Sequence, residues 1–295
     1  MIESNMEQTV THNTKWWSGG KSPFNIEYGK IMMWYFLLSD SFTFGAFLIS
    51  LGTVRFGLNY WPEPSIVFNT FPFAGHANLP LAFVSVMTFV LIISSVTMVL
   101  AVHAGHNRDR KGVEKYLILT IIGGLIFLSC QAWEWTHLLT AKNPVLVGDH
   151  IEVMAQRNGF NPWGEIVLPQ DVAPALAKTS PETLATLVHE QHLSHAGHAE
   201  LLKTPKDQLI QLLSNSEMVV RKPGPTAFGG FFYGITGFHG FHVSVGVILL
   251  LIMLIQTKMG VFDRKGHYLM IEKIGLYWHF VDLVWVFVFL CFYLI

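Results

Sequence analysis

Charged residues are scarce in this chain. Of its 295 residues, 13% are charged, 51% are hydrophobic and 14% are aromatic. A soluble protein carries about a quarter of its residues as Asp, Glu, Lys or Arg, so this composition argues against a soluble globular domain. The formal net charge is −1, and no dense run of Lys or Arg stands out. We therefore expect no nucleic-acid partner.

Cysteine is rarer still. The two cysteines, Cys130 and Cys291, each lie in a long apolar segment. Two isolated cysteines form neither a CxxC zinc motif nor a disulfide framework.

The first 30 residues are polar and lack an apolar core followed by a small-residue cleavage site. We therefore expect no cleaved signal peptide.

Long apolar segments are what the sequence has instead. Each is close to the roughly 20 residues that a helix needs to cross a bilayer. They cover residues 31–56, 80–103, 116–139, 228–256 and 274–295. The sequence therefore predicts an all-α polytopic membrane bundle with five transmembrane helices.

The loops indicate the orientation. The short loops 103–115 and 257–273 are rich in Lys and Arg, and such loops stay on the cytoplasmic side. We expect 1–30 to be a polar cytoplasmic N-terminus, 31–139 to hold the first three spans, 140–227 to be an extracytoplasmic insert, and 228–295 to end outside. Apolar spacing in the insert predicts two or three short amphipathic helices forming a small cap. Residues 161–170 and the prolines at 169, 174, 223 and 225 are typical of connecting loop and not of sheet.

A few polar residues lie within or beside the spans. An ionisable group near the bilayer centre costs at least about 2.5 kcal/mol, so each is a candidate functional residue. The simplest interpretation is structural, because buried carboxyl and imidazole groups fix helix packing through hydrogen bonds. Metal or haem ligation, proton relay and lipid-headgroup anchoring stay open. The candidates are Asp40, Gln131, Glu134, His137, His239, His242, Glu272, His279 and Asp282.

Asp40 is the lone carboxyl group of the first span. A desolvated carboxyl group is often protonated unless a partner is near, so Asp40 is a candidate for handling a proton. Packing, with Ser39 and Asp40 bonded to a neighbouring helix, is an equally simple interpretation.

Known ligand spacings test the metal hypothesis. Glu134 and His137 form one ExxH motif, whereas di-iron bundles need two plus two further carboxylates. Haem ligation would need facing imidazoles, which histidine counts alone do not establish. In the insert, four histidines recur at intervals of three from His189 to His198. On one helix these four side chains would spread too far around its circumference to share an ion. His192 and His195, helped by Glu190 or Glu200, are weak candidates for a metal site. A solvated helix face is the simpler interpretation of the four histidines.

Three motifs carry a family resemblance. Residues 236–246, TGFHGFHVSVG, resemble the TGFHGxHVxxG pattern of subunit III of the haem-copper terminal oxidases, most closely the cytochrome c oxidase branch. Residues 277–285, YWHFVDLVW, are similar to that family's YWHFVDxVW, and 131–135, QAWEW, to its QAxEY. The resemblance covers roughly residues 30–140 and 228–295 of this chain and is to the five-span bacterial form of the family. The insert between these ranges departs from the family.

The resemblance implies a non-catalytic subunit. It implies that this chain holds no haem or copper, which belong to partner subunits, and that phospholipid binds between its helices. It implies packing against catalytic subunit I beside subunit II, in a bacterial inner membrane, with support for proton uptake and lasting activity. Asp40 matches the position of a membrane-buried glutamate that reacts with carbodiimides. The other buried polar residues become packing and lipid-binding candidates, and no residue is expected to be catalytic.

Alternatives remain at this stage. Aspartate at position 40 also resembles the quinol oxidases of the cytochrome bo type. A free-standing proton-coupled transporter would show internal repeats or helices broken near the midplane, and neither is evident. A metalloenzyme built on Glu134 and His137 is a third hypothesis. The insert at 140–227 could dock a cytochrome or another respiratory complex.

Overall fold

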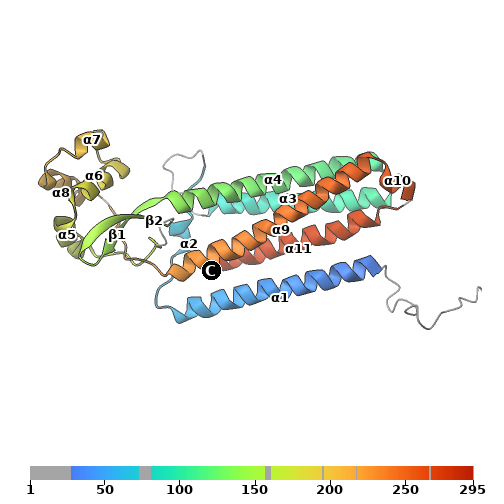
Figure 1. The fold of residues 1–295 in the computed structure, drawn as a ribbon, viewed down its shortest axis with the longest axis horizontal. Coiled ribbons are helices and arrows are strands. Elements are labelled where there is room, and N and C mark those ends of the chain that lie inside the picture. The colour runs from blue at the N-terminus through green and yellow to red at the C-terminus, as the bar shows by residue number, and fades with distance from the viewer. Residues whose placement is uncertain are drawn as a thin grey trace, which may run out of the picture.

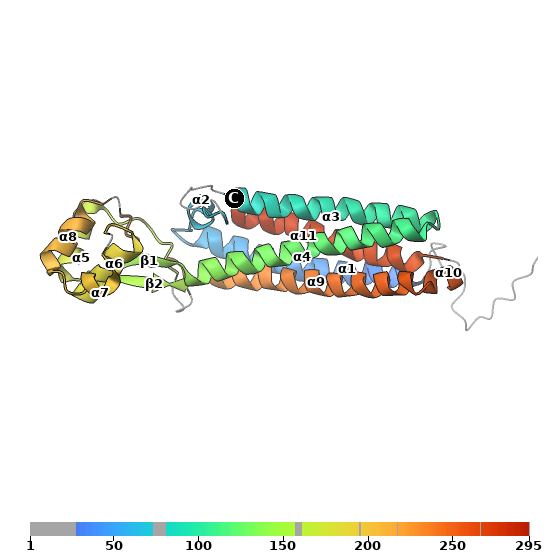
Figure 2. The ribbon, with the colours of Figure 1, turned by 90° about the horizontal axis from the view of Figure 1, so that it is seen from above.

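Five long helices run side by side along the long axis of the molecule (Figures 1 and 2). The computed structural model describes residues 28–72, 81–156, 161–194, 196–216, 218–265 and 267–294. The long helices are α1 (Tyr28–Gly57), α3 (Ala82–His106), α4 (Arg110–Thr140), α9 (Thr226–Lys258) and α11 (Leu269–Phe289), and α11 continues into a π-helical turn, Leu290–Leu294. All five are long and apolar enough to cross a membrane. The predicted all-α membrane bundle is confirmed.

The helices extend beyond the apolar segments that predicted them. Helix α4 begins at Arg110 and α11 at Leu269, whereas the sequence placed these starts at 116 and 274. Hydropathy marks the part of a helix that suits hydrocarbon, but backbone hydrogen bonding continues into the polar interface. Most of the predicted N-terminal segment 1–30 lies outside the described residues; 28–30 already belong to α1.

Four of the helices form a ring of neighbours. Helix α3 packs on α4, α4 on α9, α9 on α11, and α11 back on α3. Trp278 and Trp285 of α11 fill the centre and are fully buried. Their indole nitrogens donate to Ser94 Oγ (3.1 Å) and Thr88 Oγ1 (3.0 Å) of α3. Interhelical hydrogen bonds therefore join α11 to α3 inside an apolar core.

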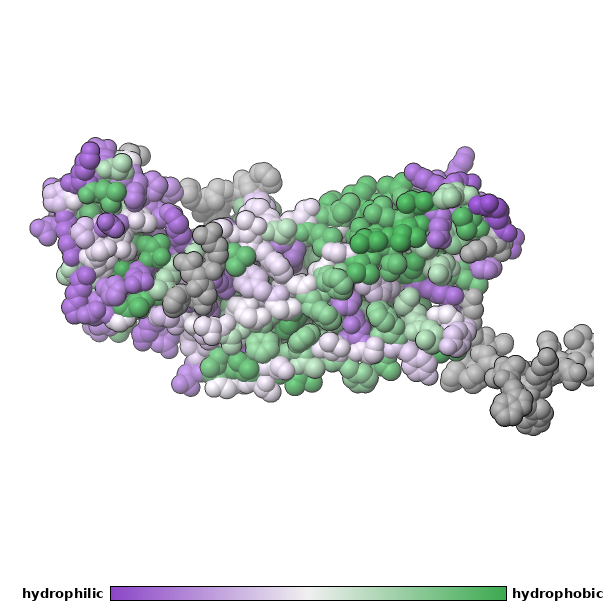
Figure 3. Space-filling model, viewed as in Figure 1, coloured by the Kyte–Doolittle hydropathy of each residue, from purple (hydrophilic) through white to green (hydrophobic). Residues whose placement is uncertain are grey.

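Helix α1 lies at the side of this ring, against α9 and α11 (Figure 1). Much of its surface is apolar and exposed, with Trp34 at 62%, Phe42 at 71% and Phe56 at 85% exposure. Exposed apolar surface covers the helical part of the molecule in Figure 3, whereas polar residues gather on the insert and at the far end. This distribution suits a bundle surrounded by lipid.

Both basic loops lie at one end of the bundle. The α3–α4 turn and the short helix α10 (Val261–Lys265) meet there, together with the start of α1 (Figure 1). Lys30 pairs with Glu272 at 2.7 Å, and Arg110 approaches Asp263 at 3.6 Å. The insert stands at the opposite end. The fold thus places both basic loops on the side opposite the insert, while the assignment of that side to the cytoplasm stays a prediction.

The insert is a small unit with its own hydrophobic core. A hairpin of β1 (Lys142–Val147) and β2 (His150–Ala155) leads into helices α5 (Pro169–Lys178), α6 (Pro181–Glu190), α7 (His198–Leu201) and α8 (Lys206–Ser214). Ile151, Leu176, Leu184 and Leu209 are buried together. The short helix α2 (Pro64–Val67) lies elsewhere, next to the π-helical turn.

The insert differs from the sequence-based expectations in three ways. The hairpin was not predicted from the sequence; a Gly148-Asp149 turn, with Gly148 at φ 64°, joins its two antiparallel strands. Residues 169 and 170 were expected to be loop but begin α5, because Pro169 occupies the first turn, where a proline costs the helix no hydrogen bond. The described part of the insert holds four helices where two or three were expected.

Glycine permits a close approach at the centre of the bundle. A Cβ on Gly124 of α4 would lie 2.7 Å from Trp278 and 2.9 Å from Val247. We predict that Gly124→Val lowers the free energy of unfolding by about 1–3 kcal/mol, because α4 must move away from α9 and α11. Gly240→Val is the matched control, since a Cβ there meets nothing within 4 Å. Thermal unfolding in detergent measures both, and equal midpoints would contradict the packing described.

Candidate functional site

Asp40 and His242 meet between α1 and α9, near the middle of both helices. Asp40 Oδ2 lies 3.1 Å from His242 Nε2, and the two side chains are 11% and 9% exposed. The other ring nitrogen, Nδ1, lies 2.8 Å from the carbonyl oxygen of Phe238. A carbonyl oxygen can only accept, so Nδ1 carries the hydrogen and donates it. In the neutral imidazole, Nε2 is therefore an acceptor.

This tautomer determines the protonation of the pair. Nε2 of His242 and Oδ2 of Asp40 lie 3.1 Å apart, and without a further proton both would be acceptors. One proton between them, carried by either Asp40 or His242, makes the contact a hydrogen bond. In both forms the pair has no net charge, so the membrane interior holds no isolated ion. The arrangement can store a proton at mid-membrane and move it between two atoms. This is the chemical capacity expected of a proton-handling residue.

Aromatic groups surround the imidazole of His242. The rings of Phe44 and Phe238 lie 5.5 Å and 4.6 Å from it, centroid to centroid. Tyr277 Oη donates to the backbone carbonyl of His242 at 2.9 Å. These contacts hold the helix segment in place and leave the Asp40–His242 contact in apolar surroundings. Neutral partners are favoured there, because separated charges lose their hydration.

Glu134 forms a second polar contact, near the insert end of α4. Its Oε2 accepts hydrogen bonds from Gln131 Nε2 at 3.3 Å and from Tyr293 Oη at 3.0 Å. Tyr293 lies in the π-helical turn after α11, and all three side chains are buried. Glu134 thus ties the end of α11 to α4. Gln131 and Glu134 are both among the residues predicted from the sequence, whereas Tyr293 is not, because an uncharged phenol in an apolar segment gives no signal.

A third polar contact joins α11 to α3. Ser95 Oγ lies 2.7 Å from His279 Nδ1. Asp282 lies one turn further along α11, and neither of its buried carboxyl oxygens makes a hydrogen bond of regular geometry within the described residues. An unpaired carboxylate is costly in such a place, so the neutral acid is the stable form.

The remaining candidates lie apart from these contacts. His239 is 1% exposed and packs between Phe127 and Trp285, at ring distances of 5.8 Å and 5.2 Å. His137 stacks on Trp133, with 5.4 Å between centroids and 9° between planes. Glu272 forms its ion pair with Lys30 at the basic end. The nine candidates are therefore distributed over the bundle and do not converge on one active site.

The histidines of the insert do not share a helix. Helix α6 ends at Glu190, His192 lies in a turn at φ 52°, and α7 begins at His198. The single-helix arrangement expected from the spacing is therefore wrong, because Gln191 ends α6. His195 lies outside the described residues. Within the part of the chain that the structure describes, no group of three His, Cys, Asp or Glu side chains is arranged to hold a metal ion.

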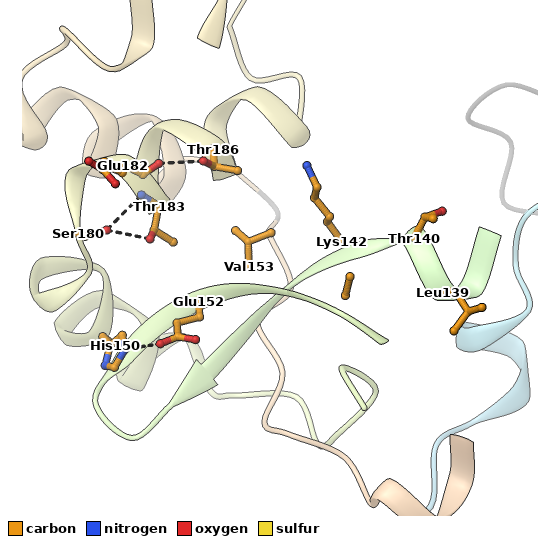
Figure 4. A pocket seen from close by; sticks show the side chains of 11 residues that line it. Leu139, Thr140, Lys142, His150, Glu152, Val153, Ser180, Glu182, Thr183 and Thr186 are labelled. Carbon is orange, nitrogen blue, oxygen red and sulfur yellow. Dashed lines mark hydrogen bonds and ion pairs between the residues drawn. The ribbon is translucent and has the colours of Figure 1, made fainter. Parts of the chain in front are cut away.

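A polar cavity of about 780 Å³ lies between the hairpin and α6 (Figure 4). Lys142, His150, Glu152 and Glu182 are among its lining residues. In Figure 4, His150 and Glu152 lie side by side on β2, 2.9 Å apart from Nε2 to Oε1. Lys142 forms an ion pair with Glu190 at 2.7 Å. Lys142 and the His150–Glu152 pair thus each have a charged partner.

Comparison with known proteins gives one consistent family. The family model for "Cytochrome c oxidase subunit III" matches residues 219–295, which include α9 and α11. "Cytochrome c oxidase subunit 3" of Prototheca wickerhamii is 29% identical over 207 residues, covering 65% of this chain and 73% of that protein. The protein of that name from Marchantia polymorpha is 47% identical over 66 residues (22% and 24% of the two chains), and the Synechocystis one 44% over 69 (23% and 29%).

The Glu134–Tyr293 contact gives a stability prediction. Tyr293→Phe removes a donor from a buried carboxyl group, and we expect the free energy of unfolding to fall by about 1–3 kcal/mol. The matched control is Tyr35→Phe on the exposed face of α1, which should change it by less than about 0.5 kcal/mol. Thermal unfolding of the purified chain compares the two. A Tyr293→Phe midpoint equal to that of the control would show that the hydroxyl contributes nothing.

The β2 hairpin gives a pH prediction. The hydrogen bond to Glu152, with a smaller contribution from Asp149, raises the pKa of His150 above its ordinary value of 6.5. A raised pKa in the folded state stabilises the fold fully below pH 6.5, and that stability is lost as the pH rises through the folded pKa. We expect the insert to resist proteolysis slightly better at pH 6 than at pH 8. His150→Gln should remove this difference; a difference that persists in the variant would contradict the assignment.

Proposed function

The chain belongs to the haem-copper oxidase subunit III family, and on this premise we propose that it is the accessory, non-redox subunit III of a proton-pumping terminal oxidase of the cytochrome c type. The Asp40–His242 contact is the observation that carries this proposal. It places a protonatable carboxyl group at mid-membrane, against the histidine of the family motif in α9. Such a pair can support proton uptake by a neighbouring catalytic subunit without being a redox site itself.

The proposed partners are oxidase subunits I and II. Haem and copper reside in those partners, and this chain contributes packing and proton handling. Its exposed apolar faces, such as that of α3 with Phe89 at 62% and Val96 at 54%, suit contact with subunit I and with lipid. Interfaces between membrane subunits bury surfaces of this kind, so a large apolar exterior is what a subunit taken out of its complex presents.

Phospholipid is a further proposed ligand. An apolar groove of about 280 Å³ lies between α1 and α9, lined by Phe47, Gly230, Phe231, Gly234 and Ile235. A Cβ at Gly230 or Gly234 would meet nothing within 4 Å, so the groove floor is open. An acyl chain is the natural occupant of such a groove in a bilayer.

We place the chain in a bacterial inner membrane. The basic loops favour a cytoplasmic N-terminus, with the insert and the C-terminus outside. The insert then stands on the side where a cytochrome or another respiratory complex could dock, and we propose it as the contact for such a partner. Its two connections leave the membrane from α4 and α9, which pack against each other.

The aspartate at position 40 favours a second candidate, the same accessory role in a quinol oxidase of the cytochrome bo type. The partner discriminates between the two, because the dinuclear copper centre of subunit II belongs to the cytochrome c type. A free-standing transporter has less support: no proline interrupts the five long helices, so they lack the broken segments typical of such sites.

Asp40→Ala tests the proposed role. We expect the oxidase to assemble but to take up protons more slowly, or to lose activity sooner during turnover, because the shared proton is gone. The matched control is Ser39→Ala, since Ser39 is exposed and donates to Phe36 of its own helix at 2.8 Å. Stopped-flow proton uptake and the inactivation rate of the purified complex are the readouts. Unchanged values for both would show that Asp40 serves packing alone.

A further inference from the structure

The segment between α6 and α7 brings two histidines together. His189 lies in the last turn of α6 and His198 is the first residue of α7. Their imidazole rings lie 5.7 Å apart, centroid to centroid, at an interplanar angle of 86°. Both residues are exposed. The sequence spacing had pointed to His192 and His195 as a pair, but the fold selects His189 and His198.

We propose that His189 and His198 form a surface site for a divalent transition-metal ion that prefers imidazole, such as Cu²⁺ or Zn²⁺. The site lies on the insert, remote from the membrane contacts, and does not depend on the function proposed above. Imidazole nitrogen suits these two ions better than it suits Mg²⁺ or Ca²⁺, which prefer oxygen. The site is therefore selective by ligand type.

The ring spacing matches a shared ion. A metal–nitrogen bond of about 2.0–2.1 Å places the ion roughly 3.2 Å from the centroid of each ligand ring. Two centroids 5.7 Å apart then subtend an angle of about 125° at the ion, close to the value in tetrahedral and trigonal sites. Rotation of the rings about their side-chain bonds would aim one nitrogen of each at the ion.

Neighbouring groups support this pair over others. Thr186 Oγ1 lies 3.2 Å from His198 Nε2, which orients that ring toward α6 and leaves its Nδ1 for an ion. Glu190 is held by Lys142 at 2.7 Å, so it is not a ready ligand. His150, elsewhere on the insert, is bonded to Glu152. Water would complete the coordination, and two protein ligands predict an affinity weaker than that of a closed structural site.

Binding would have a mechanical consequence. An ion held by His189 and His198 joins the end of α6 to the start of α7 and closes the short loop between them. Because the ligands must be unprotonated, the site would fill as the pH rises and empty as it falls. The loop on the insert surface would then be stiffer in the metal-bound chain.

Metal titration of the full-length chain tests the proposal. The chain is purified in detergent without a polyhistidine tag, treated with chelator, and titrated with Cu²⁺ while the electron paramagnetic resonance spectrum is recorded; Zn²⁺ competition follows. We expect one ion bound per chain, with hyperfine splitting from two imidazole nitrogens. His189→Gln and His198→Gln should each weaken binding by about tenfold or more, since ligand loss costs at least as much as loss of an outer partner.

His150→Gln is the matched control, because it removes an exposed insert histidine outside the pair, and it should bind as the native chain does. Glutamine keeps the polarity of the two positions, and circular dichroism verifies that each variant is folded. Native affinity in the double variant His189→Gln/His198→Gln would overturn the proposal by placing the ion on other histidines. Absence of Cu²⁺ binding by the native chain at micromolar concentration would overturn it as well.

Discussion

The contact between Asp40 and His242 joins the outer helix of this protein to the middle of α9. Helix α1 lies beside the ring of four helices and presents a mostly apolar surface, so lipid would compete with its neighbours for the same contacts. The hydrogen-bonded pair gives α1 a specific partner at one depth. The commitment of His242 Nδ1 to the Phe238 carbonyl makes the pair neutral and therefore tolerable in hydrocarbon. Loss of that arrangement would leave a carboxyl group with no partner at mid-membrane.

The same constraint shapes the other helix contacts. Trp278 and Trp285 each place an indole N–H inside the core, and hydroxyl groups of Ser94 and Thr88 receive them. Glu134 accepts from Tyr293, which fastens the last turn of the chain to α4. These pairs join polar groups on different helices and so help to set the depth and rotation of each helix. Asp282 and His239 differ, because neither the carboxyl oxygens of Asp282 nor the ring nitrogens of His239 make a hydrogen bond of regular geometry within the described residues.

Hydropathy and three motifs were enough to predict the fold class, the five spans and the family. Those features are local, since a span is recognised from about 20 consecutive residues and a motif from ten. The pairing of Asp40 with His242 could not be predicted, because the two residues are 202 positions apart and helix rotation is decided by the whole bundle. Tyr293 escaped notice because an uncharged phenol in an apolar span is ordinary. The Gly148-Asp149 turn was a readable hairpin signal, but the surrounding helical pattern obscured it.

The position of the insert is set by the helices to which it is connected. Its two connections emerge from α4 and α9, which are neighbours, so a folded unit can be placed there without disturbing the bundle. Its separate core and its histidines make it the part of the molecule where family resemblance explains least. The histidine spacing misled because it was applied to a continuous helix, whereas the chain turns after Glu190 and brings the ends of the segment together.

The central claim is that this chain works as a redox-inactive partner of a haem-bearing oxidase. The most direct measurement is purification of the tagged chain from its native membrane in mild detergent, with identification of the accompanying proteins and an absorption spectrum of the product. The account predicts co-purification with a haem-containing catalytic subunit and a copper-bearing subunit II, with all haem assigned to the former. Recovery of a homogeneous chain without any oxidase subunit, or with haem bound to the chain itself, would contradict it.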